Sequence, residues 1–303
     1  MSDAYGPADE KESMATIEAA LAAGLRHFDT ADVYGDGHNE TLLGKALAGR
    51  RQEVFLATKF GFVGDEHGQV RVDGRPQRVK SACESSLRRL GTEVIDLYYL
   101  HRRDERVPVE ETVGAMADLV RQGKVRYLGL SEVSAETLHR ASTIHPIAAV
   151  QSEYSLFTRD PEKTVLPACR ELGTALVAFS PLGRGLLTGK VKSRQELAEG
   201  DYRRNMPRFA DDNLEENLAL VKALENMALE KNATAAQVAL AWLLNQGPDI
   251  LPIPGMKRLK HLQENLGALK IQLSSDDLSR LSTLSEAVQG QRHNPQNLKF
   301  IDP

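Results

Sequence analysis

Only two cysteines, Cys83 and Cys169, occur among the 303 residues, which is too few for a disulfide framework or a cysteine-rich zinc site. No uninterrupted apolar run reaches the roughly 18 residues that a membrane-spanning helix needs. The first residues, MSDAYGPADEKES, have neither the basic region nor the apolar region of a secretory signal. These absences predict a cytoplasmic protein that does not contact a membrane.

The charges also exclude some classes of protein. Lys and Arg number 38 against 42 Asp and Glu, and the formal net charge is −4. Because the basic residues are spread along the chain and form no stripe, we expect no nucleic-acid partner. The eight histidines show no H-x₃-H-type pairing, so no metal site is expected and a metal hydrolase is disfavoured.

The apolar residues alternate between helical and strand-like spacing along the whole chain. Short buried strands are expected at 26–31, 53–58, 94–100, 125–130, 147–152, 174–179 and 250–253. Helices are expected at 11–23, 39–48, 76–90, 109–122, 134–144, 161–172, 214–230, 234–246, 258–268 and 275–287. The glycine-rich insert at 61–75 is interpreted as a loop or hairpin, and a polar tail follows the last helix.

This alternation of strand and helix predicts an α/β protein with a parallel sheet covered by helices. Strands of similar length without a linker favour one (β/α) barrel over two domains, so residues 1–303 are expected to form a single domain. The alternative is an open doubly wound sheet, which normally carries a G-x-G-x-x-G turn after its first strand. That turn is absent. The nearest candidate, Gly183, Gly185 and Gly189, comes late in the chain and has a different spacing.

Polar residues stand where the predicted strands end, which is the working face of an α/β barrel. Asp29, Lys59 and His101 end three consecutive strands, and Tyr34 follows Asp29 on the same loop. Each has an ordinary interpretation alone: Asp29 as a helix cap, Lys59 as a solvated lysine, His101 as a structural histidine, and Tyr34 as packing at the barrel mouth. Together they are expected to converge on one pocket.

These groups suit the protonation of an oxygen. A lysine ammonium beside a tyrosine stabilises the phenolate, and a carboxylate keeps the lysine charged and in place. A neutral imidazole nearby can hydrogen-bond a substrate oxygen. Protonating a carbonyl oxygen while hydride reaches its carbon is one reaction that fits. An aldolase that uses Lys59 as a Schiff-base nucleophile is an alternative.

Several segments resemble the aldo-keto reductase family, in the family's order and over nearly the whole chain. Three of them, DTADVYG at 29–35, ATKFG at 57–61 and LHRRD at 100–104, are similar to its signature segments. The likeness extends to GLSEV at 129–133, QSEYSLFTRD at 151–160, AFSPLGRGLLTG at 178–189 and LPIPGMKRLKHLQENL at 251–266. The resemblance implies a (β/α)8 TIM-type barrel that uses NADPH to reduce a small carbonyl substrate to an alcohol.

The resemblance also implies roles for the four residues at the strand ends. Tyr34 would be the general acid in reduction and the base in oxidation, with Lys59 stabilising its phenolate. Asp29 would hold Lys59 in place, and His101 would orient the carbonyl group.

The resemblance further implies the cofactor contacts, which fall into four groups. For the nicotinamide they are Ser131, Glu132, Gln151 and Phe179; for the pyrophosphate, Ser180, Pro181, Leu182, Gly183 and Arg184; for the 2′-phosphate, Gly255, Met256, Lys257 and Arg258; and for the adenine, Gln263, Glu264 and Asn265. Family members often carry Asn at the Glu132 position and Ser or Thr at the Met256 position. Two adjacent cations at a helix start suit a phosphate dianion and predict a preference for NADPH over NADH.

The substrate is less constrained by the sequence. The loops at 61–75, 102–108 and 190–213 are expected to line its pocket, and 201–213 is a candidate lid. Arg102 and Arg103 would suit an anionic or oxygen-rich substrate, or else would be charges at the barrel mouth. The oligomeric state is left open by the sequence.

Only seven strands are found, whereas the family's barrel begins with a strand ahead of the first helix. We therefore expect the barrel without its first strand, so that the strands at 26–31 and 250–253 each present an unpaired edge. Two alternative functions stay open at this point. One is an NADPH-binding regulatory or sensor subunit, and the other is a truncated form with impaired activity.

Overall fold

A curved parallel sheet forms the centre of the molecule in the computed structural model, which describes residues 1–2, 8–64 and 70–302. Its seven strands are ordered β1-β2-β5-β6-β7-β8-β9. Their bounds are β1 (His27–Asp29), β2 (Phe55–Phe60), β5 (Ile95–Leu100), β6 (Val125–Ser131), β7 (Ile147–Glu153), β8 (Ala175–Phe179) and β9 (Ile250–Ile253). The order follows the chain, as in a barrel whose strands are added one after another.

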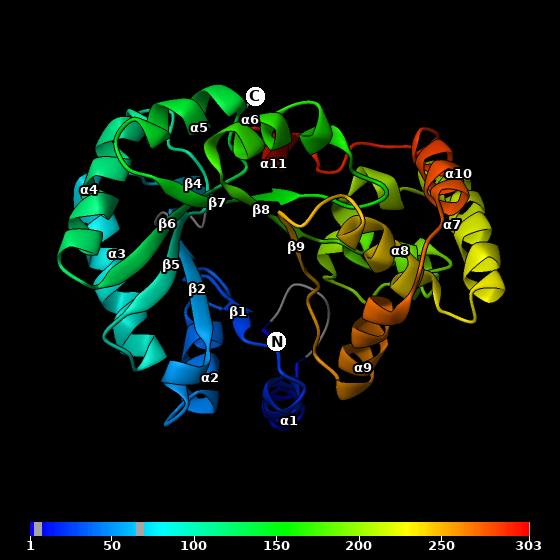
Figure 1. The fold of residues 1–303 in the computed structure, drawn as a ribbon, viewed down its shortest axis with the longest axis horizontal. Coiled ribbons are helices and arrows are strands. Elements are labelled where there is room, and N and C mark those ends of the chain that lie inside the picture. The colour runs from blue at the N-terminus through cyan, green and yellow to red at the C-terminus, as the bar shows by residue number, and fades with distance from the viewer. Residues whose placement is uncertain (3–7, 65–69, 303) are drawn as a thin grey trace.

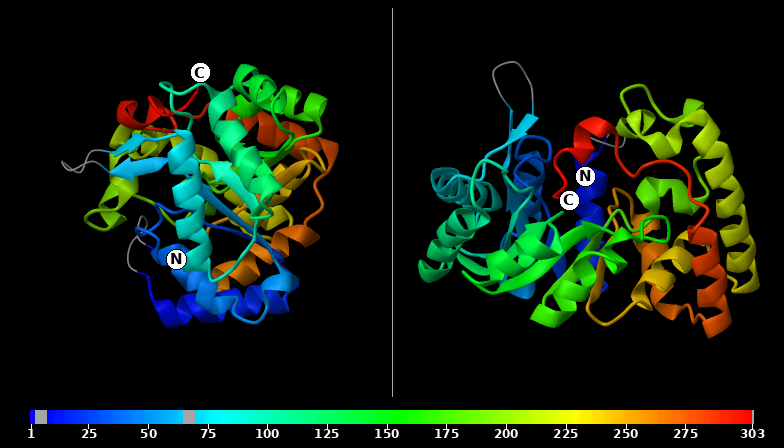
Figure 2. Two further views of the ribbon diagram at one scale, coloured as in Figure 1. Left: turned by 90° about the vertical axis from the view of Figure 1, so that its left-hand side faces the viewer. Right: turned by 90° about the horizontal axis from the view of Figure 1, so that it is seen from above.

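Helices cover the outer face of this sheet, as Figures 1 and 2 show. In chain order the helices of the described residues are α1 (Glu10–Ala22), α2 (His38–Ala46), α3 (Pro76–Leu90), α4 (Val109–Arg121), α5 (Ala135–Ser142), α6 (Val165–Leu172), α7 (Asp211–Glu230), α8 (Ala235–Leu244), α9 (Leu259–Gly267), α10 (Ser275–Ser285) and α11 (Pro295–Leu298), of which α10 packs on α7 and α11 belongs to the tail. Local signals fix several of their ends. Pro76 occupies the first turn of α3 and Gly91 ends it in the left-handed conformation, while Thr234 and Gln237 form a capping box at α8.

The predicted barrel is confirmed, and its sheet is nearly closed. Among the described residues β1 pairs only with β2, and β9 pairs only with β8. These two strands are therefore the edges of the sheet, as the seven-strand pattern predicts. Helices α1 and α9 pack against each other on the same side of the molecule (Figure 1).

Three segments differ from the sequence-based expectations or refine them. The insert carries β3 (Phe62–Gly64) paired antiparallel with β4 (Val70–Val72), and its residues 65–69 lie outside the described part. The candidate lid contains two short 3₁₀ turns, Tyr202–Asn205 and Pro207–Phe209, before α7 begins. The tail contains α11, which polar composition alone did not indicate; Pro295 follows an Asn294 cap there.

The interior of the barrel is filled closely at the level of β5 and β6. Gly129 on β6 lies opposite Tyr99 on β5, whose ring is fully buried. A Cβ atom at Gly129 would lie 2.4 Å from two ring carbons of Tyr99 and 3.1 Å from the Ala149 carbonyl oxygen. A glycine is therefore required here by packing.

We expect Gly129→Ala to lower the free energy of unfolding by about 1–3 kcal/mol, because neither the confined ring nor the backbone carbonyl can move away from the added methyl group without strain. Gly114→Ala is the matched control, since a Cβ there meets nothing within 4 Å. Because Gly114 lies in the middle of α4, Gly114→Ala should raise the free energy of unfolding by about 0.5–1 kcal/mol. Denaturant unfolding measures both, and equal effects would contradict the close approach.

Candidate active site

A buried ion pair between Lys59 and Asp29 lies at the carboxyl ends of β1 and β2. The Lys59 ammonium contacts the Asp29 carboxylate and donates to the Thr30 carbonyl oxygen at 2.6 Å. The second carboxylate oxygen of Asp29 accepts a hydrogen bond of 2.9 Å from the Gln151 side chain. Burial by itself would lower the pKa of Lys59, but the charge of Asp29 and the nearby Tyr34 phenol hold it above its ordinary value. Lys59 is therefore a fixed, fully buried cation.

The Tyr34 ring lies above this cation, on the loop that joins β1 to α2. The Lys59 nitrogen is 5.2 Å from the centre of the ring. The same loop is tied to β2 through the Asp32 amide, which donates to the Lys59 carbonyl oxygen at 3.0 Å. Tyr34 is 39% exposed, whereas Lys59 is completely buried. Of these two residues, Tyr34 is therefore the one a substrate can reach.

His101 follows β5 and meets Tyr34 edge to face, with ring centres 5.9 Å apart. Burial lowers the pKa of the imidazole well below its usual range, and the charges of Arg102 and Lys59 lower it further. The imidazole is thus neutral at neutral pH. Its outer side packs on Phe62, 4.8 Å between ring centres, and Phe62 in turn meets Phe300 of the tail at 5.7 Å. The fold therefore brings all four predicted catalytic residues together.

The residues expected near the nicotinamide also end neighbouring strands. Ser131 at the end of β6 pairs in register with Gln151 on β7, and Phe179 ends β8 beside Glu153. Beyond β8 the backbone has a positive φ at Ser180 and at the segment Gly183–Gly185. Non-glycine residues in that conformation cost energy and cluster at ligand sites.

The side chains of Glu132 and Arg184, two of the predicted cofactor residues, form close ion pairs within the protein. The Glu132 carboxylate accepts from the Glu153 amide at 2.7 Å and pairs with Arg292 at 2.6 Å. Arg184 pairs with the Glu153 carboxylate at 2.6 Å. We call Glu132, Glu153, Arg184 and Arg292 the buried ion network. Sequence reasoning missed it; Glu153 ends β7 and could have been noticed there, but nothing in the tail marks Arg292 as its partner.

The residues expected near the adenosine lie together at the start of α9 and along it. Arg258 precedes the first turn of α9, is 56% exposed as a side chain and lies 3.8 Å from the Glu12 carboxylate. The Glu264 carboxylate forms an ion pair with the Lys190 ammonium, 2.9 Å between oxygen and nitrogen. The remaining members of the group are Gly255, Met256 and Lys257 ahead of the helix and Gln263 and Asn265 within it.

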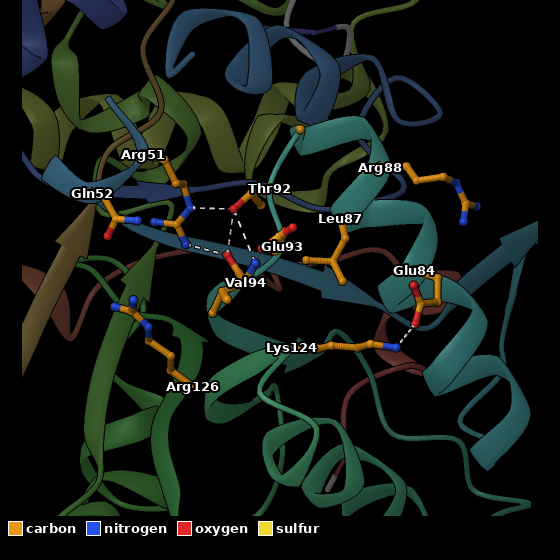
Figure 3. A pocket seen from close by; sticks show the side chains of 11 residues that line it. Arg51, Gln52, Glu84, Leu87, Arg88, Thr92, Glu93, Val94, Lys124 and Arg126 are labelled. Carbon is orange, nitrogen blue, oxygen red and sulfur yellow. Dashed lines mark hydrogen bonds and ion pairs between the residues drawn. The ribbon is translucent and has the colours of Figure 1, made fainter. Parts of the chain in front are cut away.

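A large cavity elsewhere in the molecule has no part in this site. Its volume is about 670 Å³, and it lies beside α3 at the opposite ends of the strands (Figure 3). Thr92 and Val94 precede β5 there, and Lys124 precedes β6 and bonds Glu84. None of the four predicted catalytic residues lines it.

The site thus places a lysine–carboxylate pair beneath a tyrosine and a neutral histidine at one end of a nearly closed (β/α) barrel. The model of the aldo/keto reductase family matches residues 1–286. The chain belongs to that family, and it is an oxidoreductase. The resemblance identified from its motifs is thus confirmed.

Comparisons with individual proteins agree. A relative from Glycine max, described as probable aldo-keto reductase 1, is 46% identical over 276 residues, which is 91% of this chain and 80% of the relative. A glycerol dehydrogenase from Gluconobacter oxydans superposes with a TM-score of 0.86 at 32% identity, over 96% of this chain and 90% of that one. An aldo/keto reductase from Klebsiella pneumoniae, solved with NADP and acetate, gives a TM-score of 0.72 at 30% identity, over 94% and 89%.

Among the described residues, no helix is long and apolar enough to cross a membrane. No group of three or more His, Cys, Asp or Glu side chains in the same part of the chain is arranged to hold a metal ion.

Proposed function

We propose that this enzyme reversibly reduces an aldehyde or ketone to the alcohol, with NADPH supplying hydride and Tyr34 supplying the proton. The observation that carries the proposal is the convergence of Tyr34 and neutral His101 above the ion pair that the fully buried Lys59 forms with Asp29. Oxidation of NADPH in the presence of a mixed panel of aldehydes and ketones tests it. If NADPH binds but no carbonyl compound is reduced, the proposal is wrong and the sensor function is favoured.

The proton moves from the Tyr34 hydroxyl to the carbonyl oxygen. The phenolate that remains lies beside a cation that cannot be screened, because Lys59 is fully buried. Asp29 and the Thr30 carbonyl oxygen fix the position of the ammonium. This fixed charge favours the product side of the proton transfer, which is the state that a catalyst must stabilise.

His101 orients the carbonyl group. Because the imidazole is neutral, it donates one hydrogen bond without competing with Tyr34 as the proton source. Packing against Phe62 and Tyr34 restricts the ring to one orientation. Hydride from the nicotinamide would then reach a carbonyl carbon whose oxygen is already held.

The residues present fit a dinucleotide that crosses the carboxyl ends of β6, β7 and β8. We assign Ser131 and Gln151 to the nicotinamide amide and Phe179 to the face of its ring. Because the side chains of Glu132 and Arg184 are engaged in the buried ion network, we assign to both only backbone contacts. The segment Ser180–Arg184, which includes Pro181, Leu182 and Gly183, would hold the pyrophosphate. The positive φ values of Ser180, Gly183 and Arg184, which turn the chain sharply there, support this assignment.

The cationic start of α9 is assigned to the 2′-phosphate that distinguishes NADPH from NADH. We assign Lys257 and Arg258 to the phosphate, and Gly255 and Met256 to the adjoining backbone. Gln263, Glu264 and Asn265 are assigned to the adenine. Exposure of Arg258, and its distant contact with Glu12, leave the guanidinium available to a ligand.

We expect Arg258→Ala to raise KM for NADPH about tenfold and to leave KM for NADH nearly unchanged, since one charge-assisted hydrogen bond is lost only with the phosphorylated cofactor. Steady-state kinetics with both cofactors measures this. Lys260→Ala, in the first turn of the same helix, is the matched control. Equal loss with the two cofactors would show that Arg258 does not recognise the phosphate.

A further inference from the structure

Two adjacent arginines follow His101, and the structure separates their roles. Arg103 pairs with Asp302 of the tail at 2.6 Å, and the same carboxylate accepts from the Ser134 amide at 2.9 Å. Arg103 therefore fastens the tail to the start of α5. Arg102 turns the other way, toward the site, and donates to the Ser131 hydroxyl at 3.1 Å.

Arg102 is held firmly yet has no counter-ion. It is only 9% exposed, and one of its terminal nitrogens bonds the His101 carbonyl oxygen at 2.6 Å as well as Ser131. Its guanidinium carbon lies 5.7 Å from the centre of the Phe62 ring. No carboxylate among the described residues lies within 4.0 Å of it, whereas Arg103, Arg184 and Arg292 each have one.

Part of the guanidinium is also left unused. Among the described residues no acceptor is bonded to its Nε or to its second terminal nitrogen, and neither atom is sealed from solvent. Buried charges are ordinarily paired, because an unpaired one loses its hydration without compensation. A fixed arginine with open donors is therefore suited to an anionic ligand.

The sheet order favours the substrate over the cofactor pyrophosphate as this anionic ligand. Arg102 follows β5, next to Lys59 on β2 and Ser131 on β6. The segment assigned to the cofactor pyrophosphate follows β8, and two strands, β6 and β7, separate it from β5. Arg102 thus follows the strand next to that of Lys59, on the side of the barrel where the proposed reaction places the carbonyl compound.

We propose that Arg102 binds a carboxylate of the substrate, so that the preferred substrates are carbonyl compounds with a carboxylate on or near the carbonyl carbon. This inference rests on the proposed reductase function. A guanidinium holds a carboxylate through two parallel N–H groups, and that geometry also fixes the direction of the adjoining carbonyl. His101 and Tyr34 would then hold the carbonyl oxygen while Arg102 holds the acid.

Binding tests the proposal without turnover. Oxamate carries a carbonyl next to a carboxylate, and ethyl oxamate is its neutral ester. We expect the enzyme with bound NADPH to bind oxamate more tightly than the ester. Quenching of the cofactor fluorescence measures both affinities. Arg102→Gln should weaken oxamate binding about 10- to 100-fold and change binding of the ester by less than about threefold. Arg102→Lys should restore part of the loss, since it keeps the charge but not the paired donors.

Arg103→Gln is the matched control, because its charge is neutralised by the tail. It should lower stability without changing the ratio of the two affinities. The proposal is overturned if the unmodified enzyme binds both ligands equally, or if Arg102→Gln weakens both alike. Weaker NADPH binding in Arg102→Gln, with an unchanged ligand ratio, would also overturn it and would assign Arg102 to the cofactor.

Turnover then separates this inference from the proposed function. The substrates are phenylglyoxylate and its methyl ester, and kcat/KM should favour the acid in the unmodified enzyme and the ester in Arg102→Gln. Reduction of the ester without Arg102-dependent binding of oxamate would leave the reductase function standing and remove the anion site. Arg102-dependent binding of oxamate without reduction of any carbonyl compound would leave the anion site standing and remove the reductase function.

Discussion

Tyr34→Phe is expected to lower kcat for carbonyl reduction by about 10²- to 10⁴-fold, the range that a positioned general acid contributes. The substitution removes only the hydroxyl group that would donate the proton. The ring, its edge-to-face contact with His101 and its place above Lys59 are retained. Binding of NADPH should stay close to that of the unmodified enzyme. Single-turnover oxidation of NADPH measures the chemical step apart from product release.

Tyr98→Phe is the matched control for loss of a tyrosine hydroxyl. Tyr98 lies on β5, is fully buried and donates to the Val79 carbonyl oxygen on α3 at 3.3 Å, on the helix side of the sheet. Its loss should cost about 1 kcal/mol of stability and leave kcat unchanged. Full activity in Tyr34→Phe would remove Tyr34 as the proton donor.

Lys59→Met is expected to have the second large effect, on both stability and activity. It leaves the Asp29 carboxylate buried with only the Gln151 amide as a described partner. Removing one member of a buried ion pair costs about 3–5 kcal/mol, because the remaining charge is uncompensated. Loss of the cation that stabilises the phenolate should lower kcat by about 10²- to 10³-fold, as for other fixed charge-stabilising groups.

A double variant separates the two effects. Lys59→Met with Asp29→Asn removes the uncompensated charge, and the Asn oxygen can still accept from Gln151. Stability should recover substantially, while kcat should stay low. Thermal unfolding and NADPH oxidation are the two measurements. If the double variant is as unstable as Lys59→Met alone, the cost arises from lost packing and not from the buried carboxylate.

The proposed catalytic group was predictable as a cluster because its members are all close to strand ends. In a parallel barrel the strands deliver their following residues to one face, so Asp29, Lys59 and His101 converge wherever the strands are correctly located. The boundaries were located to within a few residues by hydrophobic spacing, as β5 at 95–100 and α3 at 76–90 show. The Tyr34 position follows from its short distance along the chain from Asp29.

The proposed cofactor contacts could be derived less well by the same reasoning. A resemblance assigned Glu132 and Arg184 to the dinucleotide, but their side chains are taken by the buried ion network. Arg292, which pairs with Glu132, comes from a tail whose composition carries no periodic signal. Contacts between residues 160 positions apart in the chain depend on where the tail crosses the barrel, and no local pattern encodes that path.

By itself, the sequence determined the order of strands and helices, the family, and the group of Asp29, Tyr34, Lys59 and His101. These depend on periodicity and on the rule that parallel strands end at one face. Only the tertiary structure decided the difference between Arg102 and Arg103. The two adjacent residues look alike in the sequence, yet one is neutralised by Asp302 and the other has no carboxylate partner in the described part of the chain and lies beside His101. The reason is physical, because a charge acquires its role from the partners that folding brings to it.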